Sequence, residues 1–280
     1  ILFAGFWMVI ALAMLTSCAP DPALESKVQQ LMDSAIARHG IHGASVAVIF
    51  PDGNLQTWAS GVSHESVAMH PDMLFALGSV TKNCVDTLTL KLAEEDLLSL
   101  EDPLSKGLPD FPHVDNGITI RQLLNHTSGL YMFWENDDLW KALEADKTRI
   151  WTPEEVLEYI KEPHFERGAG WRYSNTNYLL LAMILEEATG SSLPDLLRFY
   201  LWQPLGIHDA YVSLNDNLPM DQLAHVYGDD FQFGGMDADL TFAPRASHES
   251  IAFGSSGVFI SARSLAVYTR ALFTDQILTP

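Results

Sequence analysis

The sequence has 280 residues, 48% of them hydrophobic, which is enough for one large domain or two closely joined ones. Its 16 Lys and Arg against 36 Asp and Glu give a formal net charge of -20, and a surface this acidic disfavours nucleic-acid binding and docking on anionic lipid through a basic patch. The two cysteines and ten histidines show no metal-binding spacing, and no His-Glu-x-x-His run occurs. We therefore expect neither a metal ion nor another cofactor.

Residues 1–17 are predicted to be a signal peptide that is incomplete at its start. Positions 1–15 are almost uninterruptedly apolar, which is shorter than the ~20 residues that a membrane span needs. The initiator Met and the basic segment that begin a signal peptide are not present before this apolar run. The Leu-Thr-Ser-Cys motif that ends at Cys18 resembles the bacterial lipobox, in which the cysteine becomes the lipidated first residue of the mature protein. We expect a lipid on Cys18 and a tether over residues 18–23. A plain cleaved signal, or a core helix that contains a cysteine, is the alternative.

This anchor predicts a location on the extracytoplasmic side of the bacterial cell envelope, at the outer membrane or in the periplasm. The protein would then contact the membrane only through the lipid on Cys18. A lipidated Cys18 leaves Cys84 without a cysteine partner, so no disulfide is expected even in an oxidising compartment. Cys84 is expected to be a small, buried, apolar residue.

From residue 24 to residue 280 the chain is predicted to form one domain. Its first elements are a helix, a hairpin of two strands and a second helix, over residues 24–39, 44–50, 55–62 and 79–96. The rest is mostly helical, with helices expected at 120–125, 177–189, 193–201 and 264–273 and another beginning at Thr152-Pro153. The segment 251–260 is rich in Gly and Ser, and no strand is predicted there.

A Ser-x-x-Lys pattern occurs once, from Ser79 to Lys82, and about one match is expected by chance in a chain this long. An amphipathic helix follows, so Ser79 lies at a helix N-terminus, where free N–H groups and the dipole favour negative charge. Residues three apart share a helix face, so Lys82 can reach the Ser79 hydroxyl. Either a neutral Lys82 takes the proton of Ser79, or a charged Lys82 supports another base.

A Tyr-x-Asn pattern also occurs once, from Tyr173 to Asn175. A tyrosine beside an ammonium can hold a phenolate, act as general base on Ser79 and later protonate the leaving group. Asn175 carries a donor and acceptors, and can fix a substrate and the Lys82 ammonium together. Alone, Tyr173 would be an ordinary half-buried loop residue, but the two motifs in this order favour catalysis.

With these residues the chain resembles the serine β-lactamase and penicillin-binding protein superfamily, in particular its class C β-lactamase-like branch. Supporting stretches lie at 75–82, 123–130, 171–190, 204–207 and 254–266. The resemblance implies an α+β fold of the β-lactamase/transpeptidase type, in which an antiparallel sheet is flanked by helices and joined to a mostly helical subdomain.

The resemblance also assigns roles to the four motif residues. It implies that Ser79 is the acylated nucleophile and that its backbone N–H forms half of the oxyanion hole. Lys82 would be its activator, Tyr173 the general base and Asn175 the polar partner on the substrate side. His126, in an Asn-His-Thr-Ser-Gly loop, is expected to be an internal hydrogen-bonding residue, with a role as a base as the alternative.

The third motif of the family, Lys-Thr-Gly, His-x-Gly or Trp-x-Gly on an inner strand, is not present. In family terms residue 280 falls before that strand, so the C-terminal strands of the sheet and the second oxyanion donor are expected to be missing. A truncated sequence is one explanation, and a naturally short, inactive homologue is the other. We expect the full-length protein to be an enzyme and the 280-residue fragment to be inactive, since a hairpin alone leaves an unpaired sheet edge.

The predicted function is a serine hydrolase that acts through an acyl-enzyme on ester or amide bonds, of the esterase, D-alanyl-D-alanine carboxypeptidase or β-lactamase type. Its expected partner is a small-molecule ester, amide or peptidoglycan-like substrate, and not a nucleic acid. No Gly-x-Ser-x-Gly elbow occurs, which excludes an α/β-hydrolase at the level of motifs. The alternative is a non-catalytic envelope lipoprotein that binds peptidoglycan or penicillin, although retention of Ser79 and Lys82 argues against it.

Overall fold

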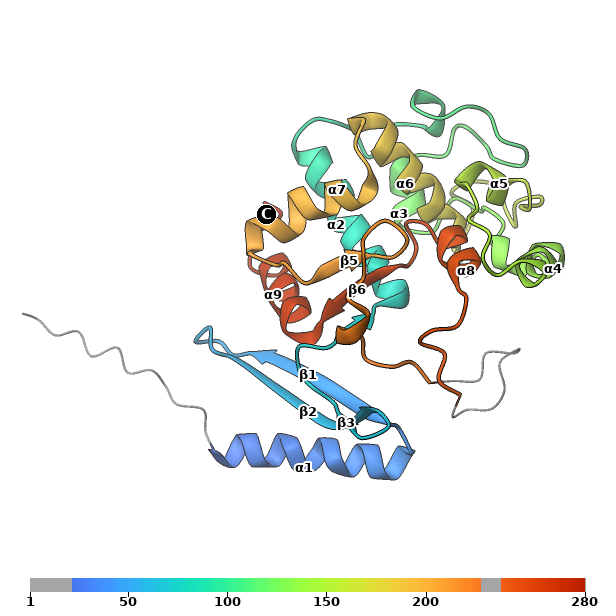
Figure 1. Ribbon diagram of the computed structural model, residues 1–280. Helices are drawn as coiled ribbons and strands as arrows, with labels where there is room; N and C mark the ends of the chain where they lie inside the picture. Colours follow the sequence, from blue (N-terminus) through green and yellow to red (C-terminus); the bar gives the residue numbers. More distant parts are fainter. Residues whose placement is uncertain (1–21, 228–237, 280) are drawn as a thin grey trace, which may run out of the picture.

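The computed structural model of the chain describes residues 22–227 and 238–279 (Figure 1). The predicted signal peptide and Cys18 lie outside the described residues. Within them, no helix combines the length and the apolar character that a membrane span requires. The same part of the chain holds no group of three or more His, Cys, Asp or Glu side chains placed to bind a metal ion.

The N-terminal elements form a helix and a sheet that lie together at one side of the molecule (Figure 1). Helix α1 (Pro22–His39) packs on strand β2 (Leu55–His64), which pairs with β1 (Gly43–Ile49) and with the short β3 (Val67–Ala68). The antiparallel register runs from Gly43 opposite Gly61 to Ile49 opposite Leu55. Strand β1 forms one edge of this sheet, and α9 (Ala262–Leu272) contacts it.

A second antiparallel sheet, in the order β4-β6-β5, was not predicted from the sequence. It consists of β4 (Leu74–Ala76), β5 (Ala210–Val212) and β6 (Val258–Ser261). Each strand has only three or four residues, too few to display a two-residue alternation, and every residue of β6 is buried. This sheet matters for the site because β4 leads directly into the turn that carries Ser79.

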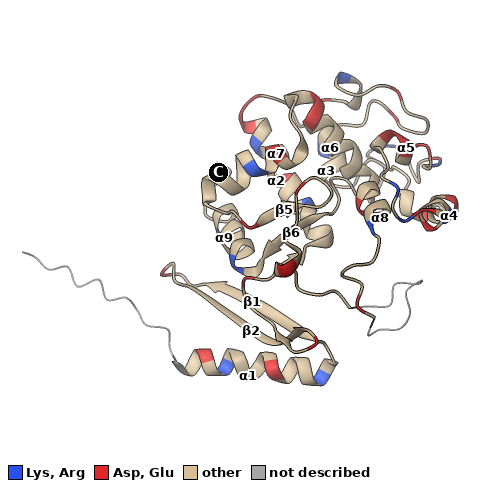
Figure 2. Ribbon diagram, in the orientation of Figure 1, with Lys and Arg blue, Asp and Glu red and all other residues tan. Residues whose placement is uncertain are grey.

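The remaining helices build the largest part of the molecule around one hydrophobic core. They are α2 (Thr81–Glu94), α3 (Ile120–Leu124), α4 (Asp137–Ala145), α5 (Pro153–Leu157), α6 (Thr176–Thr189), α7 (Leu193–Leu197) and α8 (Ala246–Ile251). Helix α6 is buried over its first ten residues, Thr176 to Leu185, because other elements enclose it and its sequence from Leu179 to Leu185 is apolar all round. Acidic residues are spread over α1, α4 and α5 rather than gathered in one element (Figure 2).

Most predicted helices are present, with shifted ends. The predicted helix 79–96 begins with a 3-10 turn over Gly78–Val80, which precedes α2. The predicted helix 193–201 consists of α7 followed by a π-helical turn that ends at Trp202. Thr152 caps α5, and Glu155 closes the capping box. Helices α4 and α8 were not predicted. Cys84 is buried at 3% exposure, as expected, and is a free cysteine.

Candidate active site

Ser79 lies where the second sheet gives way to helix α2. The Leu77 N–H donates to the carbonyl of Val258 on β6 at 2.8 Å, which ties the end of β4 to the sheet. Gly78 then adopts a φ of +51°, a conformation that favours glycine, and the chain enters the 3-10 turn. Ser79 is exposed and precedes a helix of 14 residues, whose N-terminal N–H groups and dipole face the same region.

Three of the four predicted residues come together around the Ser79 hydroxyl. The Lys82 Nζ lies 3.2 Å from the Ser79 Oγ and donates to it. The Tyr173 hydroxyl lies 3.1 Å from the same Oγ, although 94 residues separate the two in sequence. The Lys82 Nζ is also 5.1 Å from the centre of the Tyr173 ring. Both groups that could take the proton of Ser79 are therefore within direct reach of it.

The Lys82 ammonium is deeply enclosed, with 5% of the residue exposed. Burial lowers the pKa of Lys82, while the hydrogen bond and charge of Tyr173 and the charge of Asp86 raise it. The Nζ also donates to the carbonyl oxygen of Ser255 at 2.8 Å. This backbone acceptor was not found from the sequence, where the Gly- and Ser-rich composition of 251–260 was the only signal.

His126 holds the Tyr173 loop in place. Its Nδ1 accepts a hydrogen bond from the Ser174 N–H at 3.2 Å and lies 2.9 Å from the Asn177 Nδ2. Its ring centre is 4.7 Å from that of Tyr173. Burial and the charge of Lys82 lower the pKa of His126 to about 4, so the imidazole is neutral at pH 7. The contacts agree with the expected internal hydrogen-bonding role.

Asn175 occupies the N-cap position of α6, where its backbone N–H lies 3.0 Å from the Met132 sulfur. Its side-chain Oδ1 is buried and has no hydrogen-bond partner. The predicted contact of this oxygen with the Lys82 ammonium is therefore not made. An unpaired buried acceptor costs free energy, so this oxygen is an unfavourable feature of the site as it stands.

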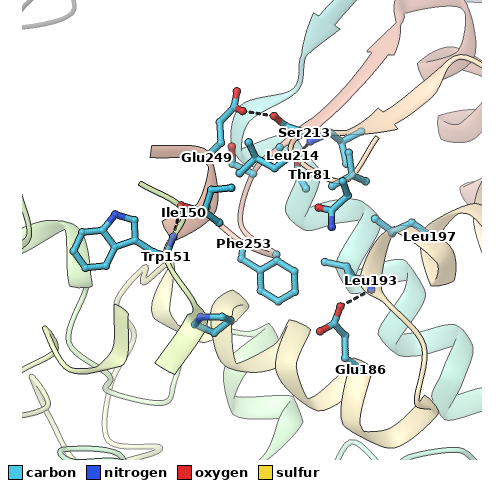
Figure 3. Close-up of a pocket in the computed structure, with 18 residues that line it drawn as sticks. Thr81, Ile150, Trp151, Glu186, Leu193, Leu197, Ser213, Leu214, Glu249 and Phe253 are labelled. Atoms are coloured by element: carbon cyan, nitrogen blue, oxygen red, sulfur yellow. Dashed lines mark hydrogen bonds between the residues drawn. The ribbon is translucent and has the colours of Figure 1, made fainter. Parts of the chain in front are cut away.

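A separate cavity of about 320 Å³ lies beside the Ser255 loop (Figure 3). Gly254, Ser256 and Gly257 line it, together with apolar side chains such as Phe253. Its two carboxylates are already engaged inside the protein: that of Glu186 accepts from the Leu193 N–H at 2.7 Å, and that of Glu249 bonds the Ser213 hydroxyl. Ser79, Lys82 and Tyr173 are not among its lining residues, so the cavity is distinct from the hydroxyl-centred site.

Comparison with known proteins gives a consistent family assignment. The family model described as Beta-lactamase matches residues 24–280. Penicillin-binding protein 4 of Amycolatopsis lactamdurans is 33% identical over 196 residues, which cover 65% of this chain and 48% of that protein. Esterase EstB of Burkholderia gladioli is 32% identical over 202 residues, which cover 67% of this chain and 51% of the esterase. The chain thus spans about half the length of these two curated relatives.

Among solved structures, the D-amino acid amidase of Ochrobactrum anthropi in complex with L-phenylalanine has a TM-score of 0.80 and 27% sequence identity to this chain. The match covers 92% of this chain and 72% of the amidase. Together with the helices and antiparallel sheets described above, it confirms the predicted α+β fold of the β-lactamase/transpeptidase type.

Proposed function

Because the chain belongs to the β-lactamase family, we propose that the protein is a serine hydrolase that forms an acyl-enzyme on Ser79. One observation carries this proposal: the Ser79 Oγ lies 3.2 Å from the Lys82 Nζ and 3.1 Å from the Tyr173 hydroxyl. A nucleophile with two hydrogen-bonded, mutually close titratable partners is the arrangement that activates a serine.

In the proposed reaction the Ser79 Oγ attacks a carbonyl carbon and loses its proton to the base within the Lys82–Tyr173 pair. The tetrahedral oxyanion lies near the N-terminus of α2, where the Ser79 N–H is the proposed donor. Its collapse breaks the bond to the alcohol or amine, which leaves with a proton returned by that base. Water then attacks the ester on Ser79, and the acid departs as the hydroxyl is restored.

The proposed substrates are small esters and amides, including β-lactams and D-alanyl-D-alanine peptides. The support is the chemistry of the relatives: an esterase, a penicillin-binding protein and a D-amino acid amidase all match this chain.

Covalent labelling tests the proposal. The protein at its full natural length is incubated with a fluorophosphonate and, separately, with a fluorescent penicillin, and the labelled peptide is sequenced by mass spectrometry. We expect an adduct on Ser79 with at least one probe. The absence of an adduct with both probes would contradict the hydrolase and favour a non-catalytic binding protein.

We further propose that the protein is a lipoprotein of the bacterial cell envelope, anchored through Cys18 on the extracytoplasmic side. The lipobox-like Leu-Thr-Ser-Cys motif after an apolar segment supports this. Metabolic labelling with a radioactive fatty acid is expected to mark the protein, and Cys18→Ala is expected to remove the label. Equal labelling of both forms would contradict the anchor.

A further inference from the structure

Helix α2 carries an acidic residue one turn beyond Lys82. Asp86 follows Lys82 by four residues, so the two share a face of the helix. The Asp86 carboxylate is half-buried and accepts a hydrogen bond from the Tyr178 hydroxyl at 2.6 Å. A carboxylate withdrawn from water on the inner side of a helix is costly, and the proposed reaction as described above gives it no task.

Tyr178, on α6, links this carboxylate to the site. Its ring centre lies 5.3 Å from the Lys82 Nζ, while its hydroxyl holds Asp86. The charge of Asp86 also raises the pKa of Cys84 on α2 and of Tyr268 on α9, so these two titratable groups face it as well. Neither of them carries a positive charge. Among the titratable groups of α2, α6 and α9 that interact with Asp86, Lys82 is therefore the cation.

Asp86 and Lys82 each stabilise the charged form of the other. Burial raises the pKa of Asp86 to about 6, while the Tyr178 hydrogen bond and the charge of Lys82 oppose this rise. In turn the Asp86 charge raises the pKa of Lys82 against the lowering caused by burial. At neutral pH an ionised Asp86 therefore stabilises the protonated form of Lys82.

We propose that Asp86 is a positioning residue that, held by Tyr178, keeps Lys82 an ammonium, so that Tyr173 and not Lys82 removes the proton of Ser79. This inference rests on the proposed acyl-enzyme function and deepens it. A neutral Lys82 acting as base would be hindered by a carboxylate behind it, because that carboxylate stabilises the form that cannot accept a proton. A charged Lys82 instead stabilises a phenolate on Tyr173, whose hydroxyl is already on the Ser79 Oγ.

The dependence of kcat/KM on pH, measured with a nitrophenyl ester, tests the assignment. As the pH is lowered through about 6, Asp86 takes up a proton, and the kcat/KM of the parent protein is expected to fall about tenfold. Asp86→Asn keeps the shape and an acceptor for Tyr178 but no charge. It is expected to lose this acid step, to have about tenfold lower kcat/KM at pH 7, and to show its alkaline limb about one pH unit lower, since Lys82 then loses its proton more readily.

Tyr178→Phe is the matched second variant. It removes the hydrogen bond that lowers the pKa of Asp86 but keeps the ring and the carboxylate. Its acid step is therefore expected at higher pH than in the parent, with the alkaline limb in place. A purely structural role of Asp86 would not remove the acid step in Asp86→Asn and raise it in Tyr178→Phe. An Asp86→Asn variant that is faster than the parent at neutral pH, or whose profile superimposes on the parent's, would overturn the inference.

A second measurement does not depend on turnover. In protein labelled with [15N]lysine, the Lys82 side-chain signal, assigned by its absence in Lys82→Met, is titrated by NMR with and without Asp86→Asn. Lys82 is expected to lose its proton about one pH unit lower in the variant. Identical titrations would overturn the inference even if Ser79 is acylated. A failure of Ser79 to react with any probe would instead overturn the proposed function and leave this titration to decide the Asp86–Lys82 coupling.

Discussion

Replacement of Ser79 by alanine is expected to abolish the covalent adduct and to lower ester hydrolysis by on the order of 10^5-fold. The Ser79 Oγ is the group that both Lys82 and Tyr173 contact, and no other hydroxyl is recorded within hydrogen-bonding distance of both in the part of the chain that the structure describes. The measurements are fluorophosphonate labelling and the initial rate on a nitrophenyl ester. The thermal unfolding midpoint is expected to change little, because Ser79 is exposed.

Ser191→Ala is the matched control, since it makes the same change at an exposed serine in the loop between α6 and α7. This variant is expected to label and to hydrolyse at the parent's rate. If Ser79→Ala kept more than a few per cent of the parent's rate while Ser191→Ala behaved like the parent, Ser79 would not be the nucleophile. An adduct that remained on Ser79→Ala would have to be mapped to another residue, and the proposed site would be wrong.

The nucleophile motif was predictable because its geometry is local. Ser79 and Lys82 are three residues apart on one helix, and helix geometry alone brings their side chains to one face. Tyr173 required the family resemblance, since nothing in a sequence states that residues 94 positions apart meet. The distance to Ser79 supports that pairing, and the chemical roles of these residues remain predictions.

Other parts of the site had no sequence signal of this kind. The carbonyl of Ser255 acts through its backbone, which every residue possesses, so only the path of the chain reveals it as an acceptor for Lys82. The strands β4, β5 and β6 are too short to show a periodicity, and tertiary contacts determine them. Asp86 did carry a signal: it is a charged residue one turn after Lys82, on the inward side of α2, and burial makes that position informative.

Replacement of Lys82 by methionine is expected to reduce acylation of Ser79 by about 10^3-fold, because without the ammonium Tyr173 loses most of the benefit of general-base catalysis, which is on the order of 10^2–10^4-fold. Methionine fills a similar volume but provides no cation for Tyr173 and no donor for the Ser79 Oγ. Lys91→Met makes the same change at the other end of α2, where Lys91 pairs with Glu94 at 3.4 Å, and is expected to leave the rate unchanged. A Lys82→Met variant that acylates within tenfold of the parent would contradict the role of Lys82.

Stability should respond to Lys82→Met in a different way from activity. Lys82 as a residue is 5% exposed, and burial disfavours its charged form, so its removal also removes a cost of folding. The Ser255 carbonyl loses a donor, which opposes that gain by about 1–3 kcal/mol. Asp86, whose pKa of about 6 is near neutrality, can take up a proton once the cation is gone, so no uncompensated charge stays behind. We therefore expect the free energy of unfolding in urea to lie within about 2 kcal/mol of the parent's, while acylation falls a thousandfold. Global unfolding of the variant would instead assign to Lys82 a structural role that its hydrogen bond to the Ser79 hydroxyl does not explain.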